Sequence, residues 1–256
     1  MGRALRNCAV LVGSLICVCA PAPAQARQSV KLTATLTPEH LGHGTTVGFA
    51  FRIVSPPGHV PSPPVSVDLR YPNDLGIALS GLGLETCLQS ALEVFGLDAC
   101  PADSRMGNGS AVVEIQVGPT IVRENAGIAV LRAPVKDGRF ALIFYADGTT
   151  PVQAQIALPA FLLSAADPFG GRVDIHLPLV PGLPESPDVV LTHLQWTLGP
   201  ADLTYYEQVH GRTVSYVPRG IQLPKSCPHG GFPFAATLTF LDGAHSTAHT
   251  SVPCPG

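Results

Sequence analysis

The chain alternates apolar and polar residues with a period of two along most of its length. Residues 30–36 and 46–53 each place every second side chain in one apolar row. Because successive side chains of a strand point to opposite faces of a sheet, this pattern predicts half-buried β-strands. The same pattern predicts further strands at 65–69, 110–117, 121–122, 128–131, 140–145, 152–158, 173–177, 189–198, 234–240 and 245–252.

Glycine, proline and aspartate separate the predicted strands. Asp137-Gly138 and Asp242-Gly243 are signals for tight hairpin turns, because these residue types tolerate the positive φ that such turns require. Residues 55–64 are rich in proline, which removes backbone donors, so this stretch is predicted to be a stiff loop. Residues 159–171 read as irregular.

One short helix is predicted over residues 84–95. Gly96 follows this segment and is a candidate for the helix C-cap. Apolar residues recur within the segment at the spacing of one helix face, at Leu84, Cys87, Leu88, Ala91, Leu92 and Phe95.

The first 26 residues are typical of a cleaved secretory signal. Arg3 and Arg6 precede an apolar run of 13 residues, which is shorter than the ~20 residues that a membrane-spanning helix needs. The small residues Ala24 and Ala26 place the cleavage after Ala26, and cleavage after Ala24 is the alternative. We therefore expect an exported chain of residues 27–256 that keeps no membrane anchor.

Four cysteines remain after removal of the signal, and an even number in an exported chain predicts disulfides. Closeness in sequence favours the pairs Cys87–Cys100 and Cys227–Cys254. Such loops correspond to roughly 3 to 3.5 kcal/mol of stabilisation each in a chain-entropy estimate. A four-thiolate zinc site is the alternative, but the tight Cys-x-x-Cys pairs that such sites prefer do not occur.

Composition and charge support an all-β chain. Charged residues make up only 13% of the sequence, whereas glycine and proline number 26 each, which disfavours long exposed helices and favours short strands joined by turns. We therefore expect an antiparallel β-sandwich, immunoglobulin-like or jelly-roll-like, with one short helix and two disulfides. A subdivision near residues 159–171 is the alternative to a single sandwich.

The charge distribution favours neither nucleic acid nor an acidic membrane surface as a partner. Removal of the signal takes away Arg3 and Arg6 and no acid, so the net charge of −3 becomes −5. The remaining basic residues are scattered, and both kinds of partner would require a basic face.

Catalytic motifs are sparse, and no cofactor fingerprint occurs. The lipase-type Gly-x-Ser-x-Gly motif and the phosphate-binding and dinucleotide-binding glycine patterns do not occur. Paired carboxylates are the main catalytic hypothesis, because glycoside hydrolysis needs two acids about 5 to 10 Å apart. The candidate pairs are Asp68 with Asp74, Glu114 with Glu124, and Asp167 with Asp174.

The histidines give weak metal candidates. His245 and His249 lie four residues apart in a predicted strand, which separates them by ~13 Å, too far to share an ion. His40 and His43 lie beside Glu39 in a glycine-rich turn, which we interpret as solvated. We expect no metal.

Aromatic residues give candidates for glycan binding. Tyr205, Tyr206 and Tyr216 fall in a polar stretch where exposure is expected, so they are the predicted binding residues. Trp196 shares the parity of Leu194 and Leu198, which predicts a place in the core instead.

Three cysteine-containing patches resemble a group of exported bacterial β-proteins that carry no assigned activity. The patches are Cys227-Pro228-His229-Gly230-Gly231-Phe232, the terminal Val252-Pro253-Cys254-Pro255, and Cys100-Pro101 with Gly107 and Gly109. The resemblance implies an extracellular β-protein with the same cysteine pairing, and it carries no catalytic residues.

These observations favour a secreted, non-enzymatic protein that binds a partner or serves a structural role at the cell envelope. The expected partner is an envelope glycan or a protein. A secreted glycan-active hydrolase that uses paired carboxylates is the alternative, motivated by compartment and fold class.

Overall fold

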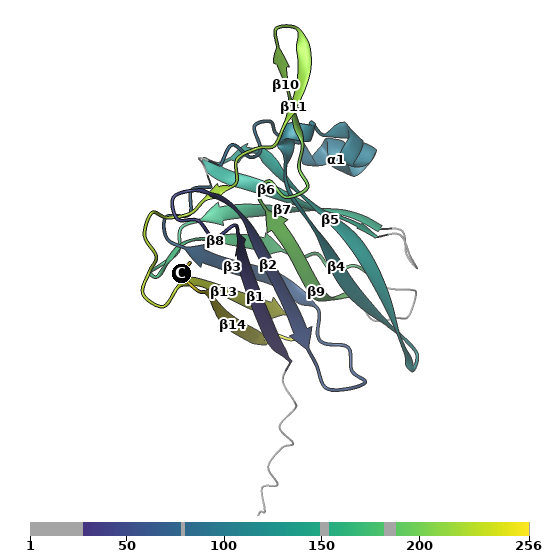
Figure 1. Cartoon of the computed structure of the whole chain (residues 1–256). Helices are drawn as coiled ribbons and strands as arrows, with labels where there is room; N and C mark the ends of the chain where they lie inside the picture. Colours follow the sequence, from purple (N-terminus) through teal and green to yellow (C-terminus); the bar gives the residue numbers. More distant parts are fainter. Residues whose placement is uncertain (1–27, 78–79, 149–153, 182–187, 256) are drawn as a thin grey trace, which may run out of the picture.

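The computed structural model describes residues 28–77, 80–148, 154–181 and 188–255. Its fourteen strands and one α-helix are shown in Figure 1. The elements are β1 (Ser29–Thr37), β2 (Gly44–Val54), β3 (Pro64–Pro72), α1 (Gln89–Phe95), β4 (Arg105–Val117), β5 (Thr120–Lys136), β6 (Arg139–Gly148), β7 (Ala154–Leu163), β8 (Phe169–His176), β9 (Val190–Leu198), β10 (Tyr205–Val209), β11 (Arg212–Tyr216), β12 (Ile221–Gln222), β13 (Phe232–Phe240) and β14 (His245–Val252).

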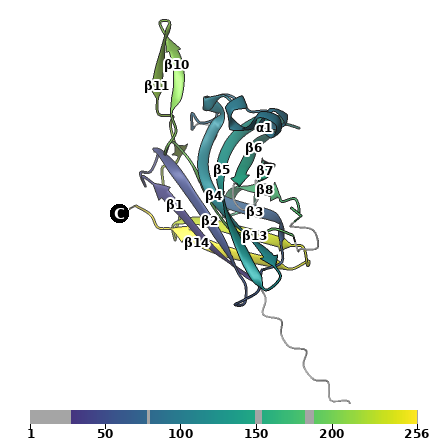
Figure 2. The same ribbon diagram turned by 90° about the vertical axis from the view of Figure 1, so that its right-hand side faces the viewer.

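Eleven of these strands follow one antiparallel path, in the order β1-β2-β9-β4-β5-β6-β7-β8-β3-β13-β14. The two ends of the path return to each other, since β1 lies against β14 and the Val30 amide donates to the Ser246 hydroxyl at 3.2 Å. The result is a nearly closed, barrel-like sheet, seen from two sides in Figures 1 and 2. The all-β class, the antiparallel pairing and the single helix are confirmed. The described strands do not divide into the two stacked sheets that a sandwich requires.

Two smaller elements complete the strands. β12 lies off this path and pairs with Gly44 and Thr45 at the start of β2. β10 and β11 form a hairpin of their own that projects from one end of the barrel (Figures 1 and 2).

The predicted alternation explains which side chains face the interior. In the sheet register Leu32 lies opposite Phe51, Phe51 opposite Leu194, and Leu194 opposite Ala111, so these residues share one face. Continuing this register around the barrel brings Val67 and other apolar residues onto the same inner face. The barrel therefore buries one continuous core.

Aromatic side chains fill the middle of the barrel. Trp196 stacks on Phe49 with ring centroids 4.9 Å apart and meets the edge of Phe144 at 5.1 Å. Phe234 approaches Phe49 from the other side at 6.2 Å. The predicted core position of Trp196 is thus confirmed, with 5% of its surface exposed.

The helix packs outside the barrel. Leu92 and Cys87 form a second buried cluster with residues on the outer face of β5 and β6, among them Leu131 and Tyr145. The helix begins at Gln89, five residues later than predicted. The amide of Cys87 donates to the Arg132 carbonyl of β5, and Leu88 has an extended backbone, so both residues lie outside the helix.

Several boundaries differ from the sequence prediction. Residues 121–122 and 128–131 belong to one long strand, β5, and the stretch 159–171 is not irregular, because β7 and β8 occupy most of it. The Asp137-Gly138 hairpin is confirmed, with φ of 53° and 73° at the two turn residues, which is the mirror-image turn that antiparallel strands prefer.

Both predicted disulfides are present. Cys87 and Cys100 have Cα atoms 5.1 Å apart, and the bridge ties the start of the helical segment to its end. Cys227 and Cys254 have Cα atoms 5.8 Å apart and flank β13 and β14. The second bridge therefore clamps the hairpin that supplies β14, one of the two edges at which the barrel closes. Disulfides of this kind are typical of oxidising, extracellular compartments.

Removal of the Cys227–Cys254 bridge tests this clamp. The double variant Cys227→Ser/Cys254→Ser should lower the free energy of unfolding by up to about 3.5 kcal/mol, because the bridge closes a longer loop than Cys87–Cys100 does. Denaturant titration of the oxidised proteins measures the difference. A loss below about 0.5 kcal/mol would show that the hairpin holds without its clamp.

Candidate functional site

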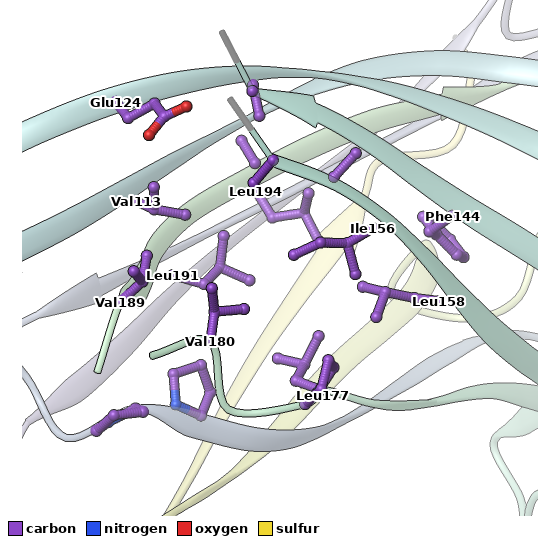
Figure 3. Close-up of a pocket in the computed structure, with 18 of the residues that line it drawn as sticks. Val113, Glu124, Phe144, Ile156, Leu158, Leu177, Val180, Val189, Leu191 and Leu194 are labelled. Carbon is purple, nitrogen blue, oxygen red and sulfur yellow. The ribbon is translucent and has the colours of Figure 1, made fainter. Parts of the chain in front are cut away.

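An apolar cavity of about 210 Å³ lies at one end of the barrel interior. The cavity lies at the end of the barrel where β4 ends, β5 begins and β9 begins. The projecting β10–β11 hairpin lies at the opposite end, because it follows the last residue of β9. Its walls come from β3 to β9 and the segments that follow β8 and precede β9 (Figure 3). Those walls include Val113, Phe144, Ile156, Leu158, Leu177, Val180, Val189, Leu191 and Leu194.

Side-chain size explains why the interior is hollow here. The aromatic cluster around Trp196 fills the middle of the barrel. Beyond Phe144 and Leu194 several inward positions of β4 to β7 carry small residues, which leaves space between the facing walls. These small residues are Ala111, Ala126, Ala146, Gly148 and Ala154.

One acidic side chain lies in this apolar wall. Glu124 lies opposite Val113 in the β4–β5 register and shares the inward parity of Ala126 and Ile128. Only 5% of Glu124 is exposed. Gly148 on β6 gives it room, because a Cβ at that position would overlap its Oε1 atom. In Figure 3 the carboxylate lies at the edge of the cavity, above Val113.

Glu124 Oε1 has no hydrogen-bond partner among the described residues. Every other described residue that lines the cavity is apolar or glycine. A buried carboxylate oxygen without a hydrogen-bond partner is costly, because it has lost water and gained no bond in return. An arrangement of this kind is typical of a binding site, in which an apolar body is held by shape and one polar group fixes its orientation.

The inward position of Glu124 could be predicted from the alternation of its strand, although the sequence predicts a role for this residue only as half of an acid pair. Glu124 alternates in step with Ala126, Ile128 and Val130, and this period predicts an inward position. The strands predicted from sequence lie on both sides of Glu124, at 121–122 and 128–131, and leave Glu124 itself unassigned.

The structure does not place Glu114 and Glu124 together as a catalytic pair. Glu114 lies opposite Arg123 and accepts a hydrogen bond from its Nε at 2.8 Å, on the outer face of the sheet. Glu124 faces the interior, so the sheet itself separates the two carboxylates.

The other predicted acids lie outside the barrel. Asp68 is held by Arg70 Nε at 2.9 Å and by Arg172 Nη1 at 2.5 Å. Asp174, opposite Asp68 on β8 and therefore on the same outer face, lies 3.7 Å from the His176 ring.

Asp74 and Asp167 lie in turns beside this network. Asp74 occupies a turn with φ of 59°, and Asp167 accepts a hydrogen bond from Asn73 at 3.2 Å.

The predicted tyrosines differ in their surroundings. Tyr206 is 53% exposed, as expected for a binding residue, whereas Tyr205 is fully buried, so its expected exposure is wrong. The Tyr205 hydroxyl accepts a hydrogen bond from the Gly83 amide at 2.9 Å and donates to the Arg105 carbonyl. Tyr216 meets the Tyr205 ring edge-on, with centroids 5.8 Å apart. Tyr205 therefore anchors the projecting hairpin to the barrel.

Within the described ranges, no group of three or more His, Cys, Asp or Glu side chains is arranged to hold a metal ion. The His40 and His43 rings meet edge-on with centroids 6.4 Å apart. Of the helices in the described part of the chain, none has the length and apolar character needed to cross a bilayer.

Comparison with known proteins gives no matching protein-family model, curated protein or solved structure.

Replacement of Tyr205 tests its anchoring role. Tyr205→Phe should lower the free energy of unfolding by about 1–3 kcal/mol, because it leaves the Gly83 amide and the Arg105 carbonyl without their partner. The exposed Tyr206→Phe is the matched control and should leave stability unchanged. Equal stability of Tyr205→Phe and the parent would contradict the anchor.

The same variant changes the alkaline stability profile. Burial raises the pKa of Tyr205 above its ordinary value of 10.0, the Asp103 charge adds to this, and the Gly83 amide opposes it. The folded state then holds its proton while the unfolded chain releases one, so stability is lost as pH rises above about 10. Tyr205→Phe should therefore lose less stability than the parent as pH rises above about 10 in denaturant titrations.

Proposed function

We propose that this protein is an exported, non-enzymatic binding protein that holds a small apolar molecule inside its barrel. The observation that carries the proposal is the apolar cavity with a buried glutamate in its wall, whose Oε1 atom has no hydrogen-bond partner among the described residues. Interiors of globular proteins are close-packed, so a cavity this large forgoes packing energy unless it is occupied.

The size and lining of the cavity define the class of ligand. An engineered apolar cavity of about 150 Å³ accommodates benzene, so a cavity of about 210 Å³ accommodates a somewhat larger molecule. The aliphatic side chains that surround it favour an alkyl chain or a single ring.

Export is supported by two independent features. The first 26 residues have the basic start, apolar run and small residues of a secretory signal. The two disulfides form in an oxidising compartment. A binding protein outside the cell would capture or carry its ligand there.

A non-enzymatic role is supported by the position of the acids. The predicted carboxylate pairs lie apart or on the outer face in ion pairs. Among the described residues that line the cavity, Glu124 is the one acid.

Binding of 1-octanol tests the proposal with a simple apolar probe. We expect a dissociation constant on the order of 10⁻⁴ M, given the binding energy that a ligand with about nine non-hydrogen atoms achieves. Methyl NMR spectra should show shifts confined to residues around the cavity, such as Val113, Ile156 and Leu191.

A cavity-filling variant provides the control. Ala146→Leu places three further carbon atoms in the cavity and should weaken octanol binding about tenfold or more. Ala50→Leu makes the same change on the outer face of β2 and should leave binding unchanged. Shifts spread over the outer surface, or no shifts at millimolar octanol, would refute the proposal.

A further inference from the structure

We infer that the ligand carries a protonated amine, and that the Glu124 carboxylate pairs with it while the apolar body fills the cavity. This inference rests on the proposed function and adds the chemistry of the head group. It starts from the one charged side chain in the cavity lining that the structure describes.

The negative charge of Glu124 in the cavity wall favours a ligand with a cationic head group. A carboxylate accepts hydrogen bonds, and an ammonium group offers three N–H donors together with the opposite charge. The described lining contains no lysine, arginine or histidine, so it offers nothing to pair with an anionic head group such as that of a fatty acid. A carboxylate ligand would instead meet the Glu124 charge in an apolar site, where repulsion is weakly screened.

No cation of the chain itself takes this place in the described structure. The neighbouring Arg123 points to the outer face, where its side chain is 72% exposed and bonded to Glu114. The described ion pairs do not include Glu124. A ligand amine would therefore supply the counter-charge and the donor that the fold leaves out.

The sheet keeps the carboxylate in position for this role. Glu124 is fixed by its strand register opposite Val113, and Gly148 leaves the space that its Oε1 atom occupies. The labelled side chains of Val113, Leu191 and Val180 lie below it in Figure 3, and Ile156 and Leu158 lie farther along. A ligand whose amine pairs with Glu124 would thus place its alkyl chain in the apolar space beside it.

A series of probes with one chain length and three head groups tests the inference. Titration calorimetry with octylamine, 1-octanol and octanoate keeps the apolar body constant. We expect octylamine to bind at least about tenfold more tightly than octanol, and octanoate to bind most weakly. This comparison uses the unmodified protein, so it does not depend on the folding of any variant.

Two variants assign the preference to the cavity. Glu124→Gln keeps the shape and removes the charge, so it should weaken octylamine binding about tenfold or more and change octanol binding by less than about threefold. Glu114→Gln removes an acid from the outer face of the same hairpin and should leave both affinities unchanged.

The outcomes separate the two proposals. If octanol binds in the cavity and octylamine binds no more tightly, the amine inference is wrong and the proposed function stands. If octylamine binds more tightly but Glu124→Gln keeps that preference, the amine lies elsewhere and the inference is also wrong. If neither probe binds, the proposed function itself fails.

Discussion

Closure of the sheet is the constraint on which the rest of the structure depends. Eleven antiparallel strands curl until β1 and β14 lie together, and every inward side chain then faces the same interior. Since the sheet has a period of two, a slip of one residue would turn the apolar row of a strand outward. The Cys227–Cys254 bridge and the hairpin that it flanks hold one of the two closing edges. Closure also leaves few free strand edges for association with other chains.

The side chains of the barrel do not fill its interior evenly. Aromatic rings occupy the middle, where Trp196 contacts Phe49 and Phe144. Towards the end at which β4 turns into β5, small residues line β4 to β7 and a cavity remains. Among the described lining residues, one carboxylate, that of Glu124, lies within that apolar wall. The shape of the cavity and this acidic group thus arise from the same alternation that builds the core, and the proposed binding role rests on both.

Local features were predictable from sequence, and long-range pairing was not. Asp137-Gly138 forms the expected hairpin, and both cysteine pairs follow from their spacing. The insertion of β9 between β2 and β4 joins segments far apart in the chain, and no local pattern encodes it. The β10–β11 hairpin was missed because His210-Gly211, a less familiar pair, takes the positive φ values of its turn. The alternation of Glu124 with Ala126 and Ile128 predicts its inward position, but the cavity beside it depends on long-range pairing that no local pattern shows.

The most direct test of the account is a crystal structure of the protein pressurised with xenon. An accessible apolar cavity takes up xenon, because the gas gains dispersion contacts with its walls and needs no hydrogen bonds. We predict a xenon site inside the barrel, among Val113, Ile156 and Leu191, without rearrangement of the strands. An interior filled by side chains, or one occupied by ordered water and free of xenon, would contradict it.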